Sequence, residues 1–392
     1  MPDVTKLPLA HQTMFADLAA RCMDAAFDEQ FPENGSFVRM AVKGRAYWYY
    51  SGYAPDPTGS GQGSRRKLYV GPADDPAIAS RVAAFADIKT NYRERRQMVQ
   101  SLTAAGLPSP TGFVGDITEI LWKAGFFRLR GVLIGTLAFQ TYSGLLGVGM
   151  RGSALMTGDA DFALFHSIAS AVGDEMPGIL GLLQDKDPTF RPVPHLGRQT
   201  VATRFKNARG FDVEFLTPNR GSDANQGKPA PMKALGDVGA EPLRFLDFLI
   251  HAPVRSVLLH KAGIPVTVPA PERYAVHKLI VATLRKTDSN GRQKARKDVV
   301  QAGMLFEALD IEGSSIDLGL AWTEAWDRGP RWQQSLVNGT SALDRKSVDI
   351  LRQAVIQACR EERRTACNYG FPPDGDNASD GGASIAKRKT MR

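Results

Sequence analysis

The chain has 392 residues, 43% of them hydrophobic, and its 49 Lys and Arg against 41 Asp and Glu give a net charge of +8. This predicts two or three domains with a real core and is compatible with anionic partners. Three cysteines without metal-ligand spacing or a paired framework indicate a reducing cytoplasm. No signal-peptide pattern is present, and the apolar residues 131–150 include Gln140, Thr141 and five glycines. We therefore expect no membrane span and no membrane partner.

The first 109 residues are expected to form a module of helices and a small antiparallel sheet. Residues 1–30 carry apolar side chains at helical spacing. Residues 37–53 are strand-like, with a turn at residues 43–44 between strands at 37–42 and 46–50, and residues 65–71 are a further predicted strand. Residues 76–102 carry one apolar stripe and are predicted to form a single long helix. The sheet mixes aromatic and basic residues, which is typical of a surface that binds single-stranded nucleic acid. The alternative is an aromatic face packed on a helix. The residues concerned are Tyr47, Trp48, Tyr49, Tyr50, Tyr69, Arg65, Arg66 and Lys67.

The most informative stretch is residues 131–164. Residues 132–134 are a short, apolar, β-branched run that predicts a buried strand, and residues 137–146 are predicted to form a helix. Gly135 and Thr136 lie between them, so their backbone N–H groups are expected at a helix start. Such N–H groups can bind a phosphate because they lack partners within the helix.

Two carboxylates follow on a predicted strand. Asp159 and Asp161 flank Ala160, and side chains at i and i+2 of a strand point to the same face. Two carboxylates placed in this way can hold a divalent cation. The alternative is that both are solvated residues of a turn or an edge strand.

A second acidic pair lies on a predicted hairpin. Residues 200–206 and 211–216 alternate apolar and polar side chains, and residues 207–210 are predicted to form the turn between them. Asp212 and Glu214 therefore share one face of a strand. The alternative for either acid is an ion pair with Arg204 or Arg209 across the hairpin.

The following segments alternate between loop, strands and helices. Residues 219–240 are rich in Gly, Asp and Pro and are expected to form a flexible loop over the site. Residues 256–259 and 264–268 are predicted paired strands. One helix is expected from Glu272 onward, and a second is expected to begin near Gln293.

These motifs resemble those of the DNA polymerase beta nucleotidyltransferase superfamily, in which a Gly-Gly or Gly-Ser turn precedes Asp-x-Asp on a strand. The segments GTLAFQTYSGLLGV and MTGDADFALF are similar to a bacterial nucleotidyltransferase-like group, and the resemblance covers about residues 110–310. Thr136 and a long gap before Asp159 depart from the pattern. The resemblance implies an NTP substrate and Mg²⁺ or Mn²⁺ held by Asp159 and Asp161. It also implies a third carboxylate that acts as general base and metal ligand, which is Glu214 by its position or else Asp212.

The segments HKL and KARKD resemble the helical half of nucleotidyltransferase toxins of the abortive-infection type. That resemblance implies that Lys278, Lys294 and Lys297 contact the triphosphate. It also implies a toxin role with an antitoxin partner. The alternative is a solvated basic helix face. His277 is expected to be a core residue or to lie behind the site rather than to catalyse.

The expected fold class is α+β, with a mixed sheet flanked by helices at residues 110–270, a helical domain at 271–363 and the N-terminal module at 1–109. Residues 364–392 are expected to form a disordered tail. The expected function is metal-dependent transfer of an NMP from an NTP to a hydroxyl of RNA, a protein or a small molecule. The alternatives are a catalytically silent protein that binds nucleic acid and a sensor that binds NTP without turning it over.

Overall fold

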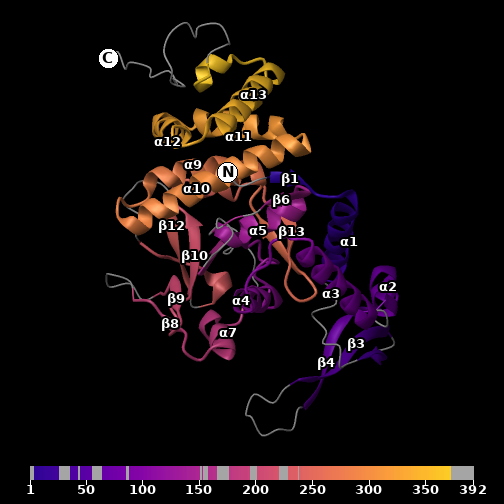
Figure 1. Ribbon diagram of the computed structural model, residues 1–392. Coiled ribbons are helices and arrows are strands. Elements are labelled where there is room, and N and C mark those ends of the chain that lie inside the picture. The colour runs from indigo at the N-terminus through magenta and orange to yellow at the C-terminus, as the bar shows by residue number, and fades with distance from the viewer. Residues whose placement is uncertain are drawn as a thin grey trace, which may run out of the picture.

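The computed structural model describes residues 4–25, 36–42, 45–54, 64–84, 88–150, 152, 158–165, 176–194, 201–219, 228–236 and 238–371. A layer of helices from the C-terminal part lies across one end of a mixed sheet, and N-terminal elements lie beside it (Figure 1). Helices and mixed sheets together agree with the expected α+β class. Within the described residues, no helix combines the length and apolar character needed to cross a membrane.

The central sheet has the strand order β11-β12-β10-β7-β5, and the short strands β9 and β8 continue from β10. β10 runs parallel to both β7 and β12, whereas β5 is antiparallel to β7 and β9 is antiparallel to β10. The β9–β10 pairing confirms the predicted hairpin. The bounds are β5 (Val132–Ile134), β7 (Asp159–Ala163), β8 (Arg191–Pro192), β9 (Arg204–Lys206), β10 (Asp212–Pro218), β11 (Ala230–Pro231) and β12 (Gly239–Leu243).

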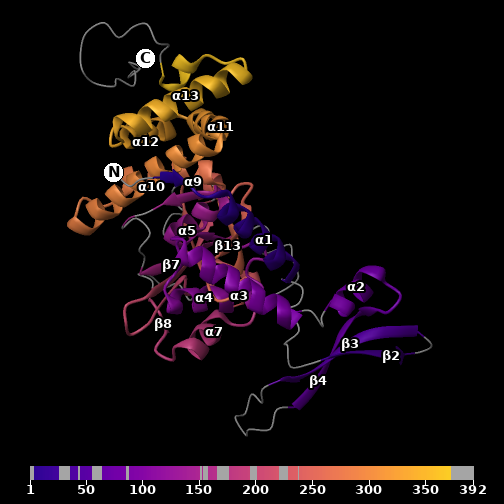
Figure 2. The same ribbon diagram turned by 45° about the vertical axis from the view of Figure 1, so that its right-hand side comes forward.

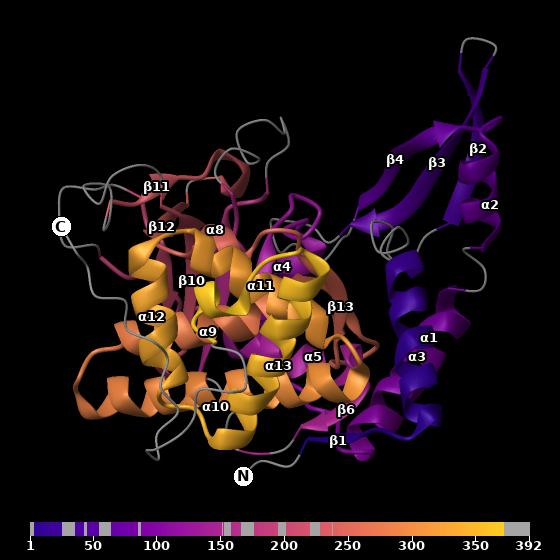
Figure 3. The same cartoon turned by 90° about the horizontal axis from the view of Figure 1, so that it is seen from above.

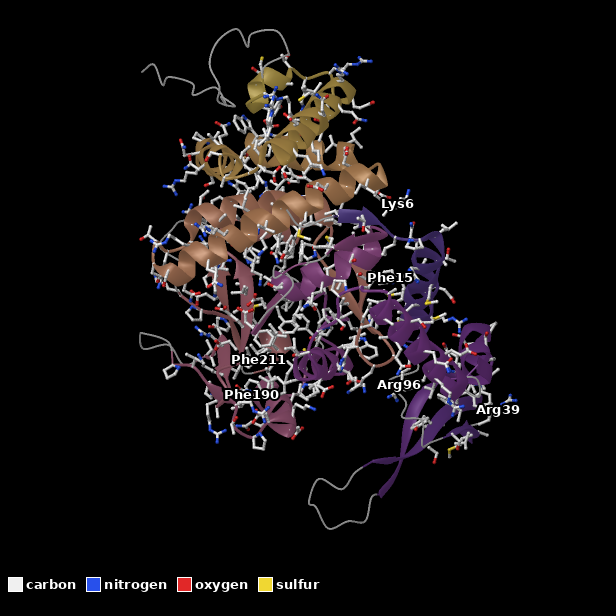
Figure 4. The ribbon with its side chains drawn as sticks, viewed as in Figure 1. Lys6, Phe15, Arg39, Arg96, Phe190 and Phe211 are labelled. Carbon is white, nitrogen blue, oxygen red and sulfur yellow. The ribbon has the colours of Figure 1, made fainter. Side chains whose placement is uncertain are left out.

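Aromatic residues on β7 and β10 form the centre of the core. Phe162 and Phe215 stack with ring centroids 5.8 Å apart, and Phe126 meets Phe162 edge-on at 5.2 Å. At the far end of the sheet, Phe190 and Phe211 both contact Phe113, and Figure 4 labels them beside β9. The surrounding elements are α4 (Gly112–Lys123), α5 (Gly135–Leu145), β6 (Val148–Met150) and α7 (Ile179–Lys186).

The start of the chain is part of this central body. β1 (Val4–Lys6) pairs antiparallel with β6. α1 (Leu9–Ala25) and α3 (Ile88–Ala104) pack on the hairpin of β13 (Val254–Leu258) and β14 (Ile264–Val268), which confirms the two strands predicted there. This contact has its own small core, and Figure 4 labels Phe15 within it; its members are Phe15, Leu18, Cys22, Val99, Leu102, Leu107, Val257 and Leu259.

A second N-terminal unit lies apart from the central sheet, as Figures 2 and 3 show. It consists of β2 (Ser36–Val42), β3 (Arg45–Ala54), β4 (Ser64–Pro72) and α2 (Pro76–Ala84). Of the predicted single helix over residues 76–102, the described residues form α2 and the first part of α3, and residues 85–87 between them lie outside the described residues. In the sheet, Tyr50 is buried and meets Phe37 of the neighbouring strand edge-on. The side chains of Arg65, Arg66, Lys67 and Tyr69 lie outside the described residues, so the predicted nucleic-acid surface stays a prediction.

The C-terminal helices pack closely on one another and on the sheet. They are α8 (Leu246–Leu249), α9 (Pro271–Leu284), α10 (Ser289–Glu312), α11 (Ser315–Asp327), α12 (Pro330–Thr340), α13 (Arg345–Glu361) and the 3₁₀ helix η6 (Ala366–Tyr369). α10 begins before the predicted Gln293 because the Asp288 carboxylate accepts a hydrogen bond from the backbone N–H of Gly291 at 2.6 Å, which caps an earlier turn.

Two predicted irregular segments are partly structured. In the predicted loop over 219–240, the described residues form β11, the 3₁₀ helix η5 (Lys233–Leu235) and the start of β12. The predicted disordered tail is wrong for residues 364–371. There the indole N–H of Trp322 donates to the Tyr369 carbonyl at 3.1 Å, and Phe371 is 2% exposed against the same tryptophan. Residues 372–392 lie outside the described residues.

Candidate active site

A pocket of about 890 Å³ opens between the sheet and the C-terminal helices. Its floor comes from the turn between β5 and α5 and from β7 and β10, and its opposite wall comes from α9, α10 and α12 (Figure 1). The pocket brings together eight of the nine residues predicted from the sequence to form the site. These are Gly135, Thr136, Asp159, Asp161, Glu214, Lys278, Lys294 and Lys297.

The strand register determines which carboxylates meet. Asp161 pairs with Glu214 across the parallel strands β7 and β10, and Asp159 pairs with Asp212. Directly paired residues on neighbouring strands lie about 4.8 Å apart. Asp159, Asp161 and Glu214 line the pocket, whereas Asp212 does not. The structure therefore separates the two candidates for the third acid.

Asp212 is held in an ion pair on the hairpin. Its two carboxylate oxygens each accept a hydrogen bond from the Arg204 guanidinium at 2.9 Å, and Lys206 lies 3.6 Å away. A bidentate pair of this kind fixes both oxygens of the acid. The alternative reading of the hairpin thus holds for Asp212, with Arg204 rather than Arg209 as its partner.

Two of the pocket carboxylates, Asp161 and Glu214, have raised pKa values. Burial, together with the charges of Asp159 and Glu214, raises the pKa of Asp161 to about 7, and the smaller opposing effects of Lys278 and Arg285 do not overcome this. Burial also raises the pKa of Glu214. Clustered acids with raised pKa values are typical of sites that hold a cation or transfer a proton. Hard carboxylate oxygens are also the ligands that Mg²⁺ and Mn²⁺ prefer, so the chemistry of these donors fits the implied metal. The ligand oxygens of the three acids do not all lie within 4.8 Å of one another, so their side chains would have to move closer together to hold one ion.

The predicted phosphate turn has the expected backbone. α5 begins at Gly135, directly after β5, and Gly135 has a φ of +66°. A Cβ at this position would lie 2.4 Å from a carboxylate oxygen of Asp161, so only glycine fits without displacing that acid. The close approach places the N-terminus of α5 directly beside the carboxylate cluster.

Tyr274 of α9 anchors this turn from the helical side. Its hydroxyl donates to the Gly135 carbonyl at 2.9 Å, and the side-chain amide of Gln301 lies 3.1 Å from the same hydroxyl. The ring is 1% exposed and packs on Phe139 and Tyr142. Tyr274 could not be recognised as a site residue from the sequence, because its position in a helical pattern gives no sign that its hydroxyl reaches another element.

Replacing Tyr274 with Phe should loosen the Gly135 turn. We expect the KM for NTP to rise roughly fivefold and the protein to lose about 1 kcal/mol of stability, since one buried hydrogen bond disappears. The matched control is Tyr142→Phe. Its hydroxyl is equally buried and donates to the Pro269 carbonyl at 2.9 Å, away from the turn. That control should lose similar stability and keep its KM, and an equal KM change in both variants would argue against the anchor.

A buried ion-pair cluster forms the wall behind the turn. Asp298 of α10 accepts hydrogen bonds from Lys278 at 2.6 Å and from Arg285 at 2.8 Å. Burial of Asp298 opposes its ionisation, but these two cations overcome that effect and lower its pKa. The structure thus fixes Lys278 and Arg285 at the pocket through one acid. Sequence reasoning did not single out Asp298 or Arg285, although an acid within a basic helix was a usable signal.

Three further residues of the helical wall differ in charge and exposure. Lys294 is exposed, whereas Lys297 is half-buried, and burial followed by the charge of Lys278 lowers the pKa of Lys297. His277 is buried, which lowers its pKa to about 3, so its imidazole is neutral. The wall therefore offers one exposed cation, one partly desolvated cation and a neutral ring.

Another acidic group lies outside this pocket. It consists of Asp116, Glu119 and His260, whose potential metal-ligand atoms all lie within 4.8 Å of one another. Among the described residues, no other three His, Cys, Asp or Glu side chains meet this criterion. Lys186 and Lys261 both form ion pairs with Asp116, and Lys261 also bonds Glu119. Although burial opposes its ionisation, these partners hold the pKa of Asp116 well below its usual range. We interpret the group as a structural ion-pair cluster.

A family model described as nucleotidyltransferase matches residues 113–327, which is more than half of the chain. The chain belongs to the nucleotidyltransferase family. The matched region of this nucleotidyltransferase begins in α4 and ends with α11, so it contains the whole floor of the pocket and its α9 and α10 walls. No curated protein and no solved structure matches the chain.

Proposed function

We propose that this nucleotidyltransferase moves a nucleoside monophosphate from an NTP to an acceptor hydroxyl and releases pyrophosphate, in the manner of the polymerase beta-like enzymes. The observation that carries the proposal is the meeting of Asp159, Asp161 and Glu214 with the Gly135 turn and a basic helical wall in one pocket. The cations would stabilise the negative charge of the NTP phosphates, and a carboxylate would act as the base for the acceptor hydroxyl.

In this proposal the three carboxylates hold Mg²⁺ or Mn²⁺, and a divalent cation bound there would neutralise charge on the NTP phosphates. The backbone N–H groups of Gly135 and Thr136 would donate to phosphate oxygens at the start of α5. Lys294 and Lys297 would contact the triphosphate from the opposite wall. Lys278 would contribute charge while it remains paired with Asp298.

Glu214 is proposed as the general base. Its burial raises its pKa, which makes its carboxylate a stronger base than an exposed glutamate. It would accept the proton of the acceptor hydroxyl as the new bond from that oxygen to the α-phosphorus forms. The bond between the α-phosphorus and the bridging oxygen then breaks, and pyrophosphate leaves with that oxygen.

The basic wall can be tested separately from the acids. We expect Lys294→Ala and Lys297→Ala to raise the KM for NTP, one of them roughly tenfold, which corresponds to ~1.4 kcal/mol. The matched control is Arg296→Ala, because Arg296 is exposed on the same helix and does not line the pocket. Steady-state kinetics with varied NTP measures the effect. Unchanged KM and kcat in both lysine variants would identify this helix face as a solvated surface.

One experiment tests the proposed function as a whole. The purified protein is incubated with Mg²⁺ and each of four α-³²P-labelled NTPs in the presence of total cell RNA, protein lysate or a small-molecule extract. Transfer to one fraction, absent with γ-labelled NTP and with Asp159→Asn, supports the proposal and identifies the acceptor class. A purified antitoxin candidate that suppresses the transfer would support the toxin role. Binding of NTP without any transfer would favour the sensor alternative.

A further inference from the structure

His277 of α9 is a buried polar side chain in the wall of the active-site pocket, and the mechanism above gives it no role. The residue lines the pocket and is 9% exposed. Within the described part of the chain, its ring nitrogens have no hydrogen-bond partner. Nearly all buried polar side chains in folded proteins have such a partner. A ring without one at the edge of a pocket is therefore placed to bond a group that enters the pocket.

The position of His277 on α9 sets it between two sides of the helix. Tyr274 and Lys278 face α10, where both have hydrogen-bond partners. Arg273 faces α8, because its guanidinium donates to the Phe248 carbonyl at 3.3 Å. With 3.6 residues per turn, His277 points between these directions, about 40° from Arg273 and about 60° from Tyr274 around the helix axis.

These two sides of α9 border chemically different parts of the pocket. α10 contributes the charged side chains of Lys294, Lys297 and Asp298 to the lining, whereas α8 contributes the apolar Leu246 and Leu249. Both α8 and α12 pack on α9 (Figure 3). The pocket is thus charged beside α10 and apolar beside α8, with the imidazole between. A nucleoside triphosphate has the same order, because its ribose joins the charged phosphates to the flat base.

We propose that His277 binds the ribose of the NTP through hydrogen bonds with its hydroxyl groups. This inference rests on the proposed function, because it requires an NTP in this pocket. Burial, followed by the charge of Lys278, lowers the pKa of His277 to about 3, so the ring is neutral at physiological pH. A neutral imidazole has one N–H donor and one acceptor nitrogen. Ribose hydroxyls both donate and accept, whereas ionised phosphate oxygens only accept, so the sugar can satisfy both ring nitrogens.

This contact makes His277 a residue that determines specificity for the sugar. A site that bonds a substrate hydroxyl through a buried polar group disfavours the analogue that lacks the hydroxyl, since the polar group then stays without a partner. The protein should therefore prefer an NTP over its 2′-deoxy analogue, its 3′-deoxy analogue or both.

Equilibrium binding tests this contact without requiring transfer. The full-length protein is titrated calorimetrically in Mg²⁺, without an acceptor, with whichever of the four common NTPs binds most tightly and with its 2′-deoxy and 3′-deoxy analogues. We expect at least one analogue to bind fivefold or more weakly than the NTP, which corresponds to ~1 kcal/mol at ~1.4 kcal/mol per tenfold. In His277→Phe, which keeps a flat ring without hydrogen-bonding groups, this ratio should fall below twofold. At least one of His277→Asn and His277→Gln, which keep a donor and an acceptor, should retain a ratio of threefold or more.

The matched control is Leu284→Ala, on the same side of α9 two turns later. Leu284 lines the pocket without a polar group and is 58% exposed, so its replacement should keep the ratio between NTP and analogue. Equal affinities of the wild type for the NTP and both analogues, or a full ratio in His277→Phe, would overturn the proposal. So would a higher KM for the acceptor in His277→Phe with an unchanged ratio, which would assign the ring to the acceptor hydroxyl. Absent transfer with an intact ratio would contradict the proposed function alone, and a wild type that binds no NTP would contradict both.

Discussion

Asp161→Asn is expected to abolish nucleotidyl transfer and, at the same time, to stabilise the metal-free protein. In the proposed function Asp161 of β7 would be a charged metal ligand, and activity is lost because a neutral amide cannot replace it. The stability is gained because the wild-type carboxylate lies among Asp159 and Glu214 with insufficient positive charge around it. Functional sites commonly retain such unfavourable groups at a cost in stability.

The gain should depend on pH in a defined direction. The pKa of Asp161 is about 7 in the folded protein, whereas an unfolded aspartate titrates near ~3.9. Between these pH values the folded state binds more protons than the unfolded state, so the free energy of unfolding of the wild type falls as the pH rises. The Asp161→Asn variant does not titrate here, so its free energy of unfolding does not fall for this reason. Its advantage should be absent below about pH 4 and reach roughly 1–3 kcal/mol above pH 7, since one pKa unit corresponds to ~1.4 kcal/mol.

The measurement is urea unfolding in EDTA at several pH values, because a bound cation would restore the stability of the wild-type cluster. The matched control is Asp298→Asn. The pKa of Asp298 is lowered by Lys278 and Arg285, so its replacement should destabilise the protein at neutral pH by leaving two cations without their partner. If Asp161→Asn also destabilises the metal-free protein at pH 8, the raised pKa of Asp161 does not reflect an unfavourable buried charge.

Glu214→Gln is expected to lower kcat by ~10²–10⁴-fold while NTP binding is largely kept. The reason is that Glu214 lines the pocket and pairs with Asp161 across the strands, where the proposed general base would face the acceptor hydroxyl. Asp212→Asn is the matched comparison, since Asp212 lies two positions away on the same strand. It should lose much less activity, because its oxygens already bind Arg204.

Single-turnover kinetics separates the two effects, because it measures the chemical step apart from NTP binding. A loss in Asp212→Asn should appear as reduced stability, through the freed Arg204, rather than as a slower chemical step. Should Asp212→Asn be the slower enzyme and Glu214→Gln nearly normal, the general base is Asp212 and the Arg204 ion pair opens during the reaction.

The strands of the floor and the start of α5 could be predicted from the sequence because each is specified locally. A β-branched run gives β5, a glycine marks its end, and period-two alternation gives the β9–β10 hairpin. The same patterns could not rank Asp212 against Glu214. That difference depends on the parallel pairing of β10 with β7, which joins residues about 50 positions apart, and on which acid Arg204 reaches across the hairpin.

Predictions failed where distant contacts determine local structure. Residues 364–371 look like the start of a polar tail, yet Phe371 finds a buried place beside Trp322 of α11. Tyr274 and Asp298 have ordinary positions in helical patterns, and only the packing of α9 and α10 against the sheet gives them partners. Periodicity reveals which face of a helix is apolar, but it does not reveal what that face touches.

The pairing of β1 with β6 has a consequence for how the chain matures during synthesis. Val4 pairs with Met150, 146 positions later, so the first strand leaves the ribosome long before its partner. At about 5–20 residues per second, this interval lasts roughly 7–30 s. During this interval β1 lacks its partner strand, and the apolar side of α1 lacks the β13–β14 hairpin on which it packs. Such exposed surface is where chaperones bind. A shortened gene that encodes only the family-matched region would lack both elements, leave β6 and the β13–β14 hairpin uncovered, and yield aggregates in expression trials.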